Sequence, residues 1–296
     1  MLKENTIEDL TEECLSEIED ISLHHAGVVL MDVPARFANL KKICLRQNRI
    51  REIQYVDVEE LDLYDNLIKK IDPLSQRLVF LDLSFNKIKS IDNLSALANL
   101  ERLYLSNNRI PHITGLDTLG KLKVLELGKN RIKEIAGLDS LVSLEELWLG
   151  GNYIEKIEGV SCLARLRIFS LQENKLKRIE GLTGLEQLQE IYLGQNEIDS
   201  LEGIEETNTL NTLDISGNRI SSLEELAQLE NLEELWANDN KIETIDELSF
   251  LECTPLKTLY LSGNNAANHP NYRGKVWSYL SAVEFLDGNP VRILRE

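Results

Sequence analysis

Histidine and cysteine, the residue types most often found in metal sites and in nucleophilic catalysis, are few in this sequence and widely separated. The histidines are His24, His25, His112 and His269, and the cysteines are Cys14, Cys44, Cys162 and Cys253. Their spacing matches no metal-ligand or paired-cysteine motif, so we expect reduced thiols. The sequence also contains no P-loop and no glycine-rich dinucleotide-binding motif. We therefore expect no enzymatic activity, no metal and no cofactor.

Aromatic residues, by contrast, recur at a regular spacing. Tyr104, Trp148, Tyr192 and Trp236 follow one another at intervals of 44 residues. Midway between them stand Glu126, Ser170 and Asp214. Tyrosine and tryptophan supply much of the binding energy of protein interfaces, so this spacing indicates recognition rather than catalysis. For Ser170, no histidine lies two predicted strands away, which argues against a nucleophile.

The segment LEELWANDN, residues 232–240, indicates how these residues reach the surface. In a β-strand, successive side chains point to opposite faces. If Leu235 and Ala237 face the core, Trp236 and Glu234 both point away from it. An aromatic row rimmed by acids exceeds the isolated apolar residues of an ordinary surface and predicts a protein-binding site. The alternative is that the rings pack on one another and only thicken the sheet.

An internal repeat is expected to position these residues. The pattern Leu-x-Leu-x-x-Asn recurs through the chain, with its asparagines at Asn48, Asn66, Asn86, Asn108, Asn130, Asn152, Asn174, Asn196, Asn218, Asn240 and Asn264. Successive spacings are 18, 20, then 22 seven times, and finally 24 residues. A further step of 22 residues back from Asn48 reaches Ala26, with Ile21 and Leu23 in strand positions. We interpret this stretch as a degenerate first repeat.

Each repeat is expected to form a short strand, a turn and a return. In residues 109–130, apolar residues recur at every third position before a Leu-x-Leu strand, which favours a 3₁₀-like return over an α-helix. Such units cannot bury their apolar edge alone and must stack. The sequence thus predicts an α/β leucine-rich-repeat solenoid, right-handed and curved, with a parallel β-sheet on its concave face and 3₁₀ or short helical returns on its convex face. The asparagine amides should satisfy backbone groups at the turns.

The spacing changes near both ends of the array. Two shortened repeats between Asn48 and Asn86 keep their strands, so the missing residues must come from the returns. We divide the chain into three parts. Residues 1–20 form an acidic N-terminal extension or cap, which is either ordered on the first repeat or loosely ordered. Residues 21–264 form about 11–12 repeats, and residues 265–296 form a C-terminal cap. Helical spacing supports this last assignment at Tyr272, Val276, Trp277, Leu280 and Val283.

The chain is strongly acidic, with 50 acidic and 32 basic residues and a formal net charge of −18 over 296 residues. This charge disfavours phosphate-rich partners, so we expect neither nucleic acid nor a membrane surface as a partner. No run of about 18 apolar residues exists to span a membrane, and the first residues lack the apolar stretch of a signal peptide. We expect a partner protein with a basic surface and a chain that is monomeric when free.

Several stretches of the repeats are distinctive. They are CLRQNRI at 44–50, LDLYDNLIKKI at 61–71, LDLSFN at 81–86, LELGKNRI at 125–132, LDISGNRI at 213–220 and WANDN at 236–240. With the 22-residue unit and the cap that begins near HPNYRGKVW, they resemble the leucine-rich-repeat regulatory subunits of type-1 protein phosphatase, from about Ile21 to Val291. The resemblance implies a non-enzymatic protein that binds the phosphatase catalytic subunit and controls its activity, maturation or location, in the nucleus and cytoplasm.

The resemblance also implies a binding surface. In that family the concave face grips the catalytic subunit through a row of aromatics and acids. Transferred position by position, this row is Asp82, Tyr104, Glu126, Trp148, Asp214, Glu234, Trp236 and Tyr260, and the spacing argument adds Tyr192. Tyr104 and Trp148 stand where the family often has phenylalanine. The alternative function is an adaptor of the same fold for another complex, spliceosomal or cytoskeletal.

Overall fold

The structure, a computed structural model, describes residues 17–33, 37 and 39–291. Most of the predicted N-terminal extension or cap, including Cys14, and the last five residues of the predicted C-terminal cap lie outside the described residues. The described chain divides into two compact units. The N-terminal unit runs to Leu147 without Lys133–Ile135, and the C-terminal unit comprises Lys133–Ile135 and the chain from Trp148 onward.

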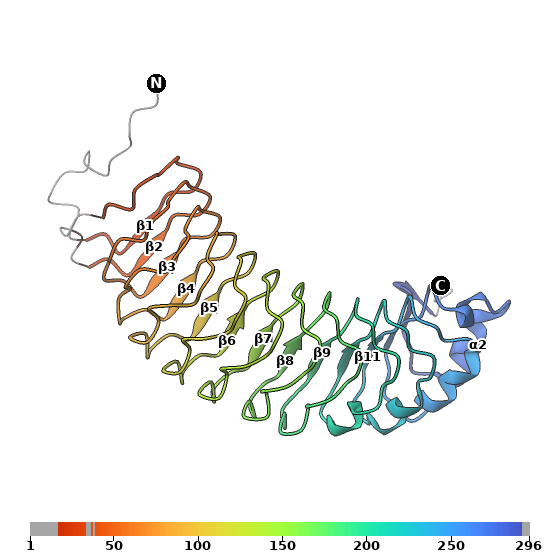
Figure 1. Cartoon of the computed structure of the whole chain (residues 1–296). Helices are drawn as coiled ribbons and strands as arrows, with labels where there is room; N and C mark the ends of the chain where they lie inside the picture. The colour runs from red at the N-terminus through yellow and green to blue at the C-terminus, as the bar shows by residue number, and fades with distance from the viewer. Residues whose placement is uncertain (1–16, 34–36, 38, 292–296) are drawn as a thin grey trace. The chain divides into compact units, whose positions relative to one another are not determined.

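In the N-terminal unit each repeat contributes one three-residue strand to a parallel sheet (Figure 1). The strands are β1 (Asp20–Ser22), β2 (Lys42–Cys44), β3 (Glu60–Asp62), β4 (Phe80–Asp82), β5 (Arg102–Tyr104) and β6 (Val124–Glu126). Strands that are consecutive in the chain are neighbours in the sheet, as Leu81 opposite Leu103 illustrates. The degenerate first repeat is β1, in which Ile21 pairs with Ile43.

The shortened repeats leave this sheet intact. Cys44 lies opposite Asp62, and Asp62 lies opposite Asp82, so β2, β3 and β4 keep the same register as the full-length repeats. The missing residues therefore come from the returns, as the sequence indicates.

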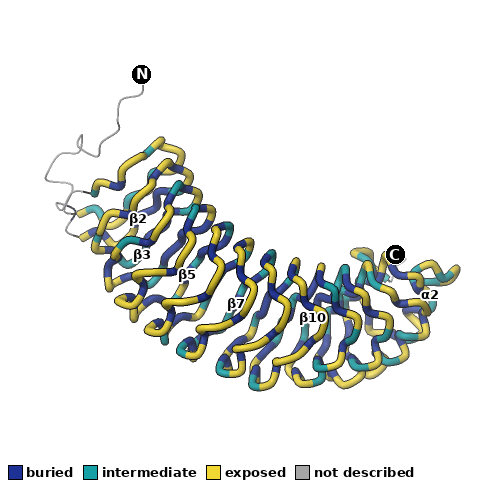
Figure 2. Tube along the Cα trace, in the orientation of Figure 1, coloured by how far each residue is buried: buried dark blue, intermediate teal, exposed yellow. Residues whose placement is uncertain are grey.

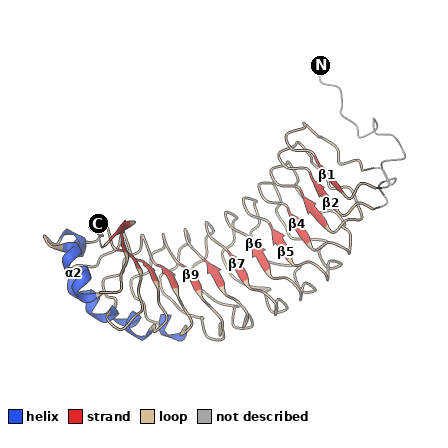
Figure 3. Cartoon of the chain, turned by 180° about the vertical axis from the view of Figure 1, so that it is seen from behind, coloured by secondary structure: helices blue, strands red, loops and turns tan. Residues whose placement is uncertain are grey.

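The C-terminal unit continues the parallel strand pattern as far as β13 (Phe285–Leu286), ends in a short antiparallel pair of β13 with β14 (Asn289–Pro290), and adds helical segments. Its other strands are β8 (Ile168–Ser170), β9 (Glu190–Tyr192), β10 (Thr212–Asp214), β11 (Glu234–Trp236) and β12 (Thr258–Tyr260), and β7 (Glu146–Trp148) contains the unit boundary. Its helices are the 3₁₀ segments η2 (Ile204–Glu206), η3 (Glu224–Gln228), η4 (Ile245–Leu251) and η5 (Asn265–Asn268) and the α-helix α2 (Tyr272–Tyr279). Among the described residues, helices occur only in this unit (Figure 3).

The returns follow the predicted period of three. Leu119 donates its backbone N–H to the carbonyl of Leu116 at 3.0 Å, and Leu122 donates to Leu119 at 2.9 Å. The same i→i+3 bonds recur in other repeats and lengthen into 3₁₀ helices from η2 onward. Side chains three residues apart eclipse in this geometry, which is why every third residue is apolar.

Leucine and isoleucine side chains fill the core of each unit, and buried segments recur in every turn (Figure 2). The middle residue of a strand points inward and is fully buried, as at Leu103 and Leu213. Phe169 takes this position in β8 and is the largest fully buried side chain. In the terminal segment α2 contains Tyr272, Val276 and Trp277 of the predicted helical stripe, whereas Leu280 and Val283 follow the helix. Val276, Leu280 and Val283 are buried, but Trp277 is 45% exposed.

The repeated asparagines bond to the backbone on both sides, as predicted. Asn108 donates its Nδ2 hydrogens to the carbonyls of Leu83 (2.9 Å) and Leu105 (3.0 Å), and its Oδ1 accepts the N–H of Ile88 at 2.9 Å. Each amide thereby links two successive repeats at the point where the strand ends. Across the described part of the chain, no helix combines the length and apolarity that membrane crossing requires.

Candidate protein-binding site

The first and third residues of each strand point away from the core and form what we call the strand face. Every predicted site residue lies on it. Asp82, Tyr104 and Glu126 end successive strands of the N-terminal unit, β4 to β6. In the C-terminal unit the third positions are Trp148, Tyr192, Asp214, Trp236 and Tyr260, and Glu234 is the first residue of β11.

In the C-terminal unit four rings form a continuous contact, which we call the aromatic row: Trp148, Tyr192, Trp236 and Tyr260. The ring centroids of Trp148 and Tyr192 lie 6.2 Å apart with an interplanar angle of 21°, a stacked pair. Tyr192 and Trp236 meet at 6.2 Å and 64°, and Trp236 and Tyr260 at 6.0 Å and 72°, both edge to face. All four side chains are half-buried. These are the geometries that aromatic pairs prefer.

The rings lie closer together than the strand spacing alone predicts. Tyr192 and Trp236 are both paired to β10, on opposite sides of Asp214, so their backbones are two strands apart, about 10 Å. Their centroids are nevertheless only 6.2 Å apart, and the side chain between them is the short, buried Asp214. Trp148 and Tyr192 approach in the same way across Ser170, which is 1% exposed. Ring packing and partial exposure thus coexist in one surface.

Two of the predicted acids are buried rather than exposed. Asp82 and Asp214 are 6% and 8% exposed, and each Oδ1 accepts a backbone N–H two residues ahead, from Ser84 and Ser216, at 2.9 Å. Burial raises the pKa of both carboxyl groups above its ordinary range. Their main structural effect is to hold the end of the strand, because a short carboxylate there reaches the chain's own amides first.

The strand face also carries half-buried acids: Glu126 and Glu234, which were predicted as site residues, and Glu60, Glu146 and Glu190, which were not. The Tyr192 hydroxyl donates to Glu190 Oε2 at 2.6 Å. Burial, reinforced by this bond, raises the pKa of Tyr192. Glu190 and Glu234 lie on either side of Thr212 in neighbouring strands, so two carboxylates flank the aromatic row.

The indole N–H of Trp236 is buried and lacks a hydrogen-bond acceptor among the described residues. An unsatisfied buried donor of this kind ordinarily costs about 1–3 kcal/mol. Trp236 lies edge to face with two tyrosine rings, and an aromatic face is a weak acceptor for such a donor. The tryptophan is therefore held by ring packing and not by a polar anchor.

In the N-terminal unit the strand face carries further rings that sequence reasoning missed. Phe80 packs on Tyr104 with centroids 5.5 Å apart, and the guanidinium of Arg102 lies 5.2 Å from the Phe80 centroid. Burial raises the pKa of Tyr104. Phe80 and Arg102 occupy the first position of their strands, whereas the regular spacing of aromatics in the sequence concerns the third position. Reading the first position as well would have identified both residues.

A second aromatic group lies where β2 to β4 end. Tyr64 and Phe85 have centroids 4.9 Å apart, and the Arg46 guanidinium lies 5.2 Å from the Tyr64 centroid. Arg46 also pairs through Nε with Asp62 Oδ2 at 2.5 Å and through Nη2 with Asp82 Oδ2 at 3.4 Å. Asp82, predicted as a free contact residue, is thus already engaged by an arginine of its own chain.

The described residues contain no cluster of three or more histidine, cysteine, aspartate or glutamate side chains placed to hold a metal ion. Two contacts of His24 were not predicted: its Nε2 lies 2.8 Å from Ser22 Oγ and 3.5 Å from Cys44 Sγ. Burial raises the pKa of Cys44, which favours the neutral thiol over the nucleophilic thiolate.

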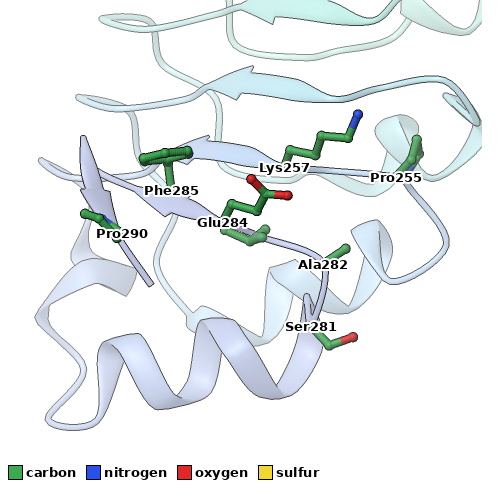
Figure 4. A pocket seen from close by; sticks show the side chains of 8 residues that line it. Pro255, Lys257, Ser281, Ala282, Glu284, Phe285 and Pro290 are labelled. Carbon is green, nitrogen blue, oxygen red and sulfur yellow. The ribbon is translucent and has the colours of Figure 1, made fainter. Parts of the chain in front are cut away.

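A pocket of about 650 Å³ lies at the C-terminal end of the chain (Figure 4). It is lined by Pro255, Lys257, Ser281, Ala282, Val283, Glu284, Phe285 and Pro290. Its lysine is bound elsewhere, since Lys257 Nζ pairs with Glu233 Oε2 at 2.7 Å. The pocket therefore has a mainly apolar lining, with Ser281 and Glu284 as its other polar side chains.

Comparison with known proteins agrees with this architecture. The family described as Leucine Rich repeats (2 copies) matches residues 76–119, 120–162, 164–206, 208–250 and 230–268. An internalin of Listeria monocytogenes has a similar structure, with a TM-score of 0.70 and 23% identity over 94% of this chain and 89% of that one. A leucine-rich-repeat protein of Leptospira interrogans has a TM-score of 0.70 and 25% identity over 93% of this chain and 80% of that one.

Curated relatives match over shorter segments. A stretch of 100 residues is 44% identical to the protein phosphatase 1 regulatory subunit SDS22 of Saccharomyces cerevisiae and covers 30% of each chain. A stretch of 102 residues is 34% identical to the protein phosphatase 1 regulatory inhibitor subunit PPP1R7 homolog of Arabidopsis thaliana, covering 30% of this chain and 31% of that one. These matches thus span less than a third of the relatives' length.

Proposed function

This chain belongs to the leucine-rich repeat family, and from that premise we propose that it is a non-catalytic regulatory subunit that binds the catalytic subunit of type-1 Ser/Thr protein phosphatase through its strand face. Binding would control the activity, maturation or location of the phosphatase, in the nucleus and the cytoplasm. A fluorescent fusion of the chain tests the compartments.

The aromatic row is the observation that carries the proposal. Four half-buried rings in mutual contact form a surface that is ordered before a partner arrives. Rings already held by their neighbours lose little side-chain freedom on binding, so more of their burial energy is available as affinity. Tryptophan and tyrosine are also the residue types that dominate interface energetics.

The charge of the surface supports a basic partner. Glu190 and Glu234 flank the aromatic row, and the whole chain carries a net charge of −18. Complementary charge speeds association and excludes acidic competitors more than it adds affinity. Tyr104 and Glu126 are proposed contacts on the N-terminal unit. Asp82 and Asp214 are proposed to support the surface from within, because their carboxylates already bind backbone amides.

The relatives support the identity of the partner. The yeast and plant proteins that share segments with this chain are named as protein phosphatase 1 regulatory subunits. The fold by itself would suit any leucine-rich-repeat adaptor, so the partner's name comes from these relatives and from the resemblance of the repeats.

Calorimetric titration of the purified chain with the purified type-1 catalytic subunit tests the proposal. Replacing Trp236 and Glu234 together by alanine should weaken binding by about 2–4 kcal/mol, since a buried interface aromatic is lost. Trp277→Ala is the matched control, because Trp277 is an exposed tryptophan of the same unit outside the aromatic row. Undiminished binding by the double variant would refute the assigned surface. A wild-type chain that fails to bind the phosphatase would refute the partner and favour another adaptor role.

A further inference from the structure

Phe85 occupies a backbone position that disfavours a phenylalanine. The residue directly before each repeated asparagine has a positive φ, between 52° at Asn107 and 77° at Gly263. In other repeats this position holds glycine or a polar residue, such as Gln47 and Asp65, whereas Phe85 adopts φ 56°. Left-handed backbone strains a bulky residue and persists where the surrounding structure imposes it, which makes such residues candidates for function.

The Phe85 side chain is also exposed, at 42% of its surface, in spite of its size. One side of the ring packs on Tyr64, at a centroid distance of 4.9 Å. Tyr64 in turn carries the Arg46 guanidinium, 5.2 Å from its centroid. The order Arg46, Tyr64, Phe85 thus places a guanidinium on the first ring and leaves the last ring partly open to solvent.

The chemistry next to the open ring favours a cation. Asp65 occupies the same left-handed position one repeat earlier, where its N–H donates to Ser84 O at 2.9 Å, and Phe85 N–H donates to Ser106 O at 2.8 Å. Successive repeats are about 4.8 Å apart, so the exposed Asp65 stands beside Phe85. Asp62 and Asp82 share a single cation, because both pair with Arg46. This part of the surface therefore carries three carboxylates, of which Arg46 pairs with Asp62 and Asp82.

We propose that the exposed ring of Phe85, with Asp65 beside it, binds an arginine side chain of a partner protein. A planar guanidinium stacks on an aromatic face and pairs with a neighbouring carboxylate at the same time. The Arg46–Tyr64 pair is the same arrangement within the chain, since Arg46 stacks on a ring and bonds to Asp62. The first partner to test is the type-1 phosphatase catalytic subunit, a choice that rests on the proposed function.

The variants separate an arginine site from a structural role. Phe85→Asn removes the ring and places asparagine, which tolerates left-handed backbone, where Asn107 already shows it. Its melting temperature should be unchanged within about 2 °C or raised. Phe85→Leu keeps apolar area without a π face, and Phe85→Tyr keeps the ring. Gln47→Asn is the control, because it is a neutral change at the same left-handed position of the same unit.

In calorimetric titration with the catalytic subunit, Phe85→Asn and Phe85→Leu should bind about three- to thirtyfold more weakly than wild type. Phe85→Tyr and Gln47→Asn should bind like wild type. Asp65→Asn should weaken binding and lessen its dependence on salt. Wild-type affinity in Phe85→Leu would overturn the arginine site. If the double replacement of Trp236 and Glu234 by alanine still weakened binding in that case, the proposed function would stand without the arginine site.

A second measurement does not depend on the phosphatase. The peptide acetyl-Gly-Arg-Gly-Arg-Gly-amide and its lysine counterpart are titrated into the labelled chain, with the amide resonances of Phe85 and Asn86 observed. The arginine peptide should shift these resonances at lower concentration than the lysine peptide, and this preference should vanish in Phe85→Leu but not in Gln47→Asn. Equal responses of wild type and Phe85→Leu would refute the proposal even if the phosphatase fails to bind the wild-type chain.

Discussion

The rings of Tyr192 and Trp236 meet edge to face at 6.2 Å although a full strand, β10, runs between the strands that carry them. This contact is possible because the intervening side chain is Asp214, which is short and folded back onto the Ser216 amide. From Trp148 to Trp236 the aromatic row thus alternates large and small residues, and the small ones let the large ones touch; Trp236 and Tyr260 meet directly from adjacent strands.

The pair should show energetic coupling. In a double-mutant cycle on unfolding, Tyr192→Ala and Trp236→Ala should each destabilise the chain, with an interaction energy of about 0.5–1.5 kcal/mol. Trp236→Phe should cost less than Trp236→Ala, because it keeps a ring and removes a buried N–H without an acceptor. Urea denaturation measures both. Strictly additive effects would mean that the rings are merely neighbours.

Asp214 should make stability depend on pH. Because burial raises the pKa of Asp214 above its ordinary value, the folded chain holds this proton more tightly than the unfolded chain. The resulting stabilisation is complete below the unfolded pKa and is lost as the pH rises through the folded pKa. Asp214→Asn keeps an oxygen for the Ser216 N–H and should gain about 1 kcal/mol at pH 7. The gain should shrink toward pH 4. Asp199→Asn, at an exposed site, should show no such trend.

The stability of the chain should be sensitive to truncation of the repeated asparagines. Asn108→Ala leaves the Ile88 N–H and the carbonyls of Leu83 and Leu105 without their side-chain partner, at an expected cost of about 2–4 kcal/mol. Hydrogen exchange at the Ile88 amide should accelerate in step with this loss. Asn99→Ala, an exposed asparagine of the same unit, should change stability by less than about 0.5 kcal/mol. Unaltered protection of Ile88 would contradict this role of the asparagines.

Core damage should remain local. Leu193 is fully buried in the C-terminal unit, and Leu193→Ala should cost about 2–5 kcal/mol. Since each repeat contacts mainly its neighbours, limited proteolysis should cut first in the repeats next to residue 193. Val142→Ala, at a side chain 58% exposed, should leave the pattern unchanged. Even cutting along the whole chain would show that the repeats unfold together.

Strand positions could be predicted with confidence from the sequence because two signals coincide there. The alternation of apolar and polar residues places Leu213 in the core, and the Asn218 amide must bond to backbone groups of the turn that follows. Only one register of the strand satisfies both requirements. The helical stripe of the terminal segment was predicted less well, because spacing alone cannot tell that Trp277 of α2 turns outward. For the candidate site, the period of the sequence identified which side chains share a face. It did not identify which of them already form hydrogen bonds or ion pairs within the chain.

The amino-acid sequence by itself determined the repeat, the direction of the side chains along each strand and the buried leucines and isoleucines, because these depend on local alternation and on the period of 22 residues. Only the tertiary structure decided that Asp82 and Asp214 bind backbone amides, and that Trp148, Tyr192, Trp236 and Tyr260 touch. It also brought Arg46 onto Tyr64 and Tyr64 onto Phe85. These ring contacts join residues that are about 20 or 44 positions apart, and their distances follow from how neighbouring turns stack, which no local pattern encodes.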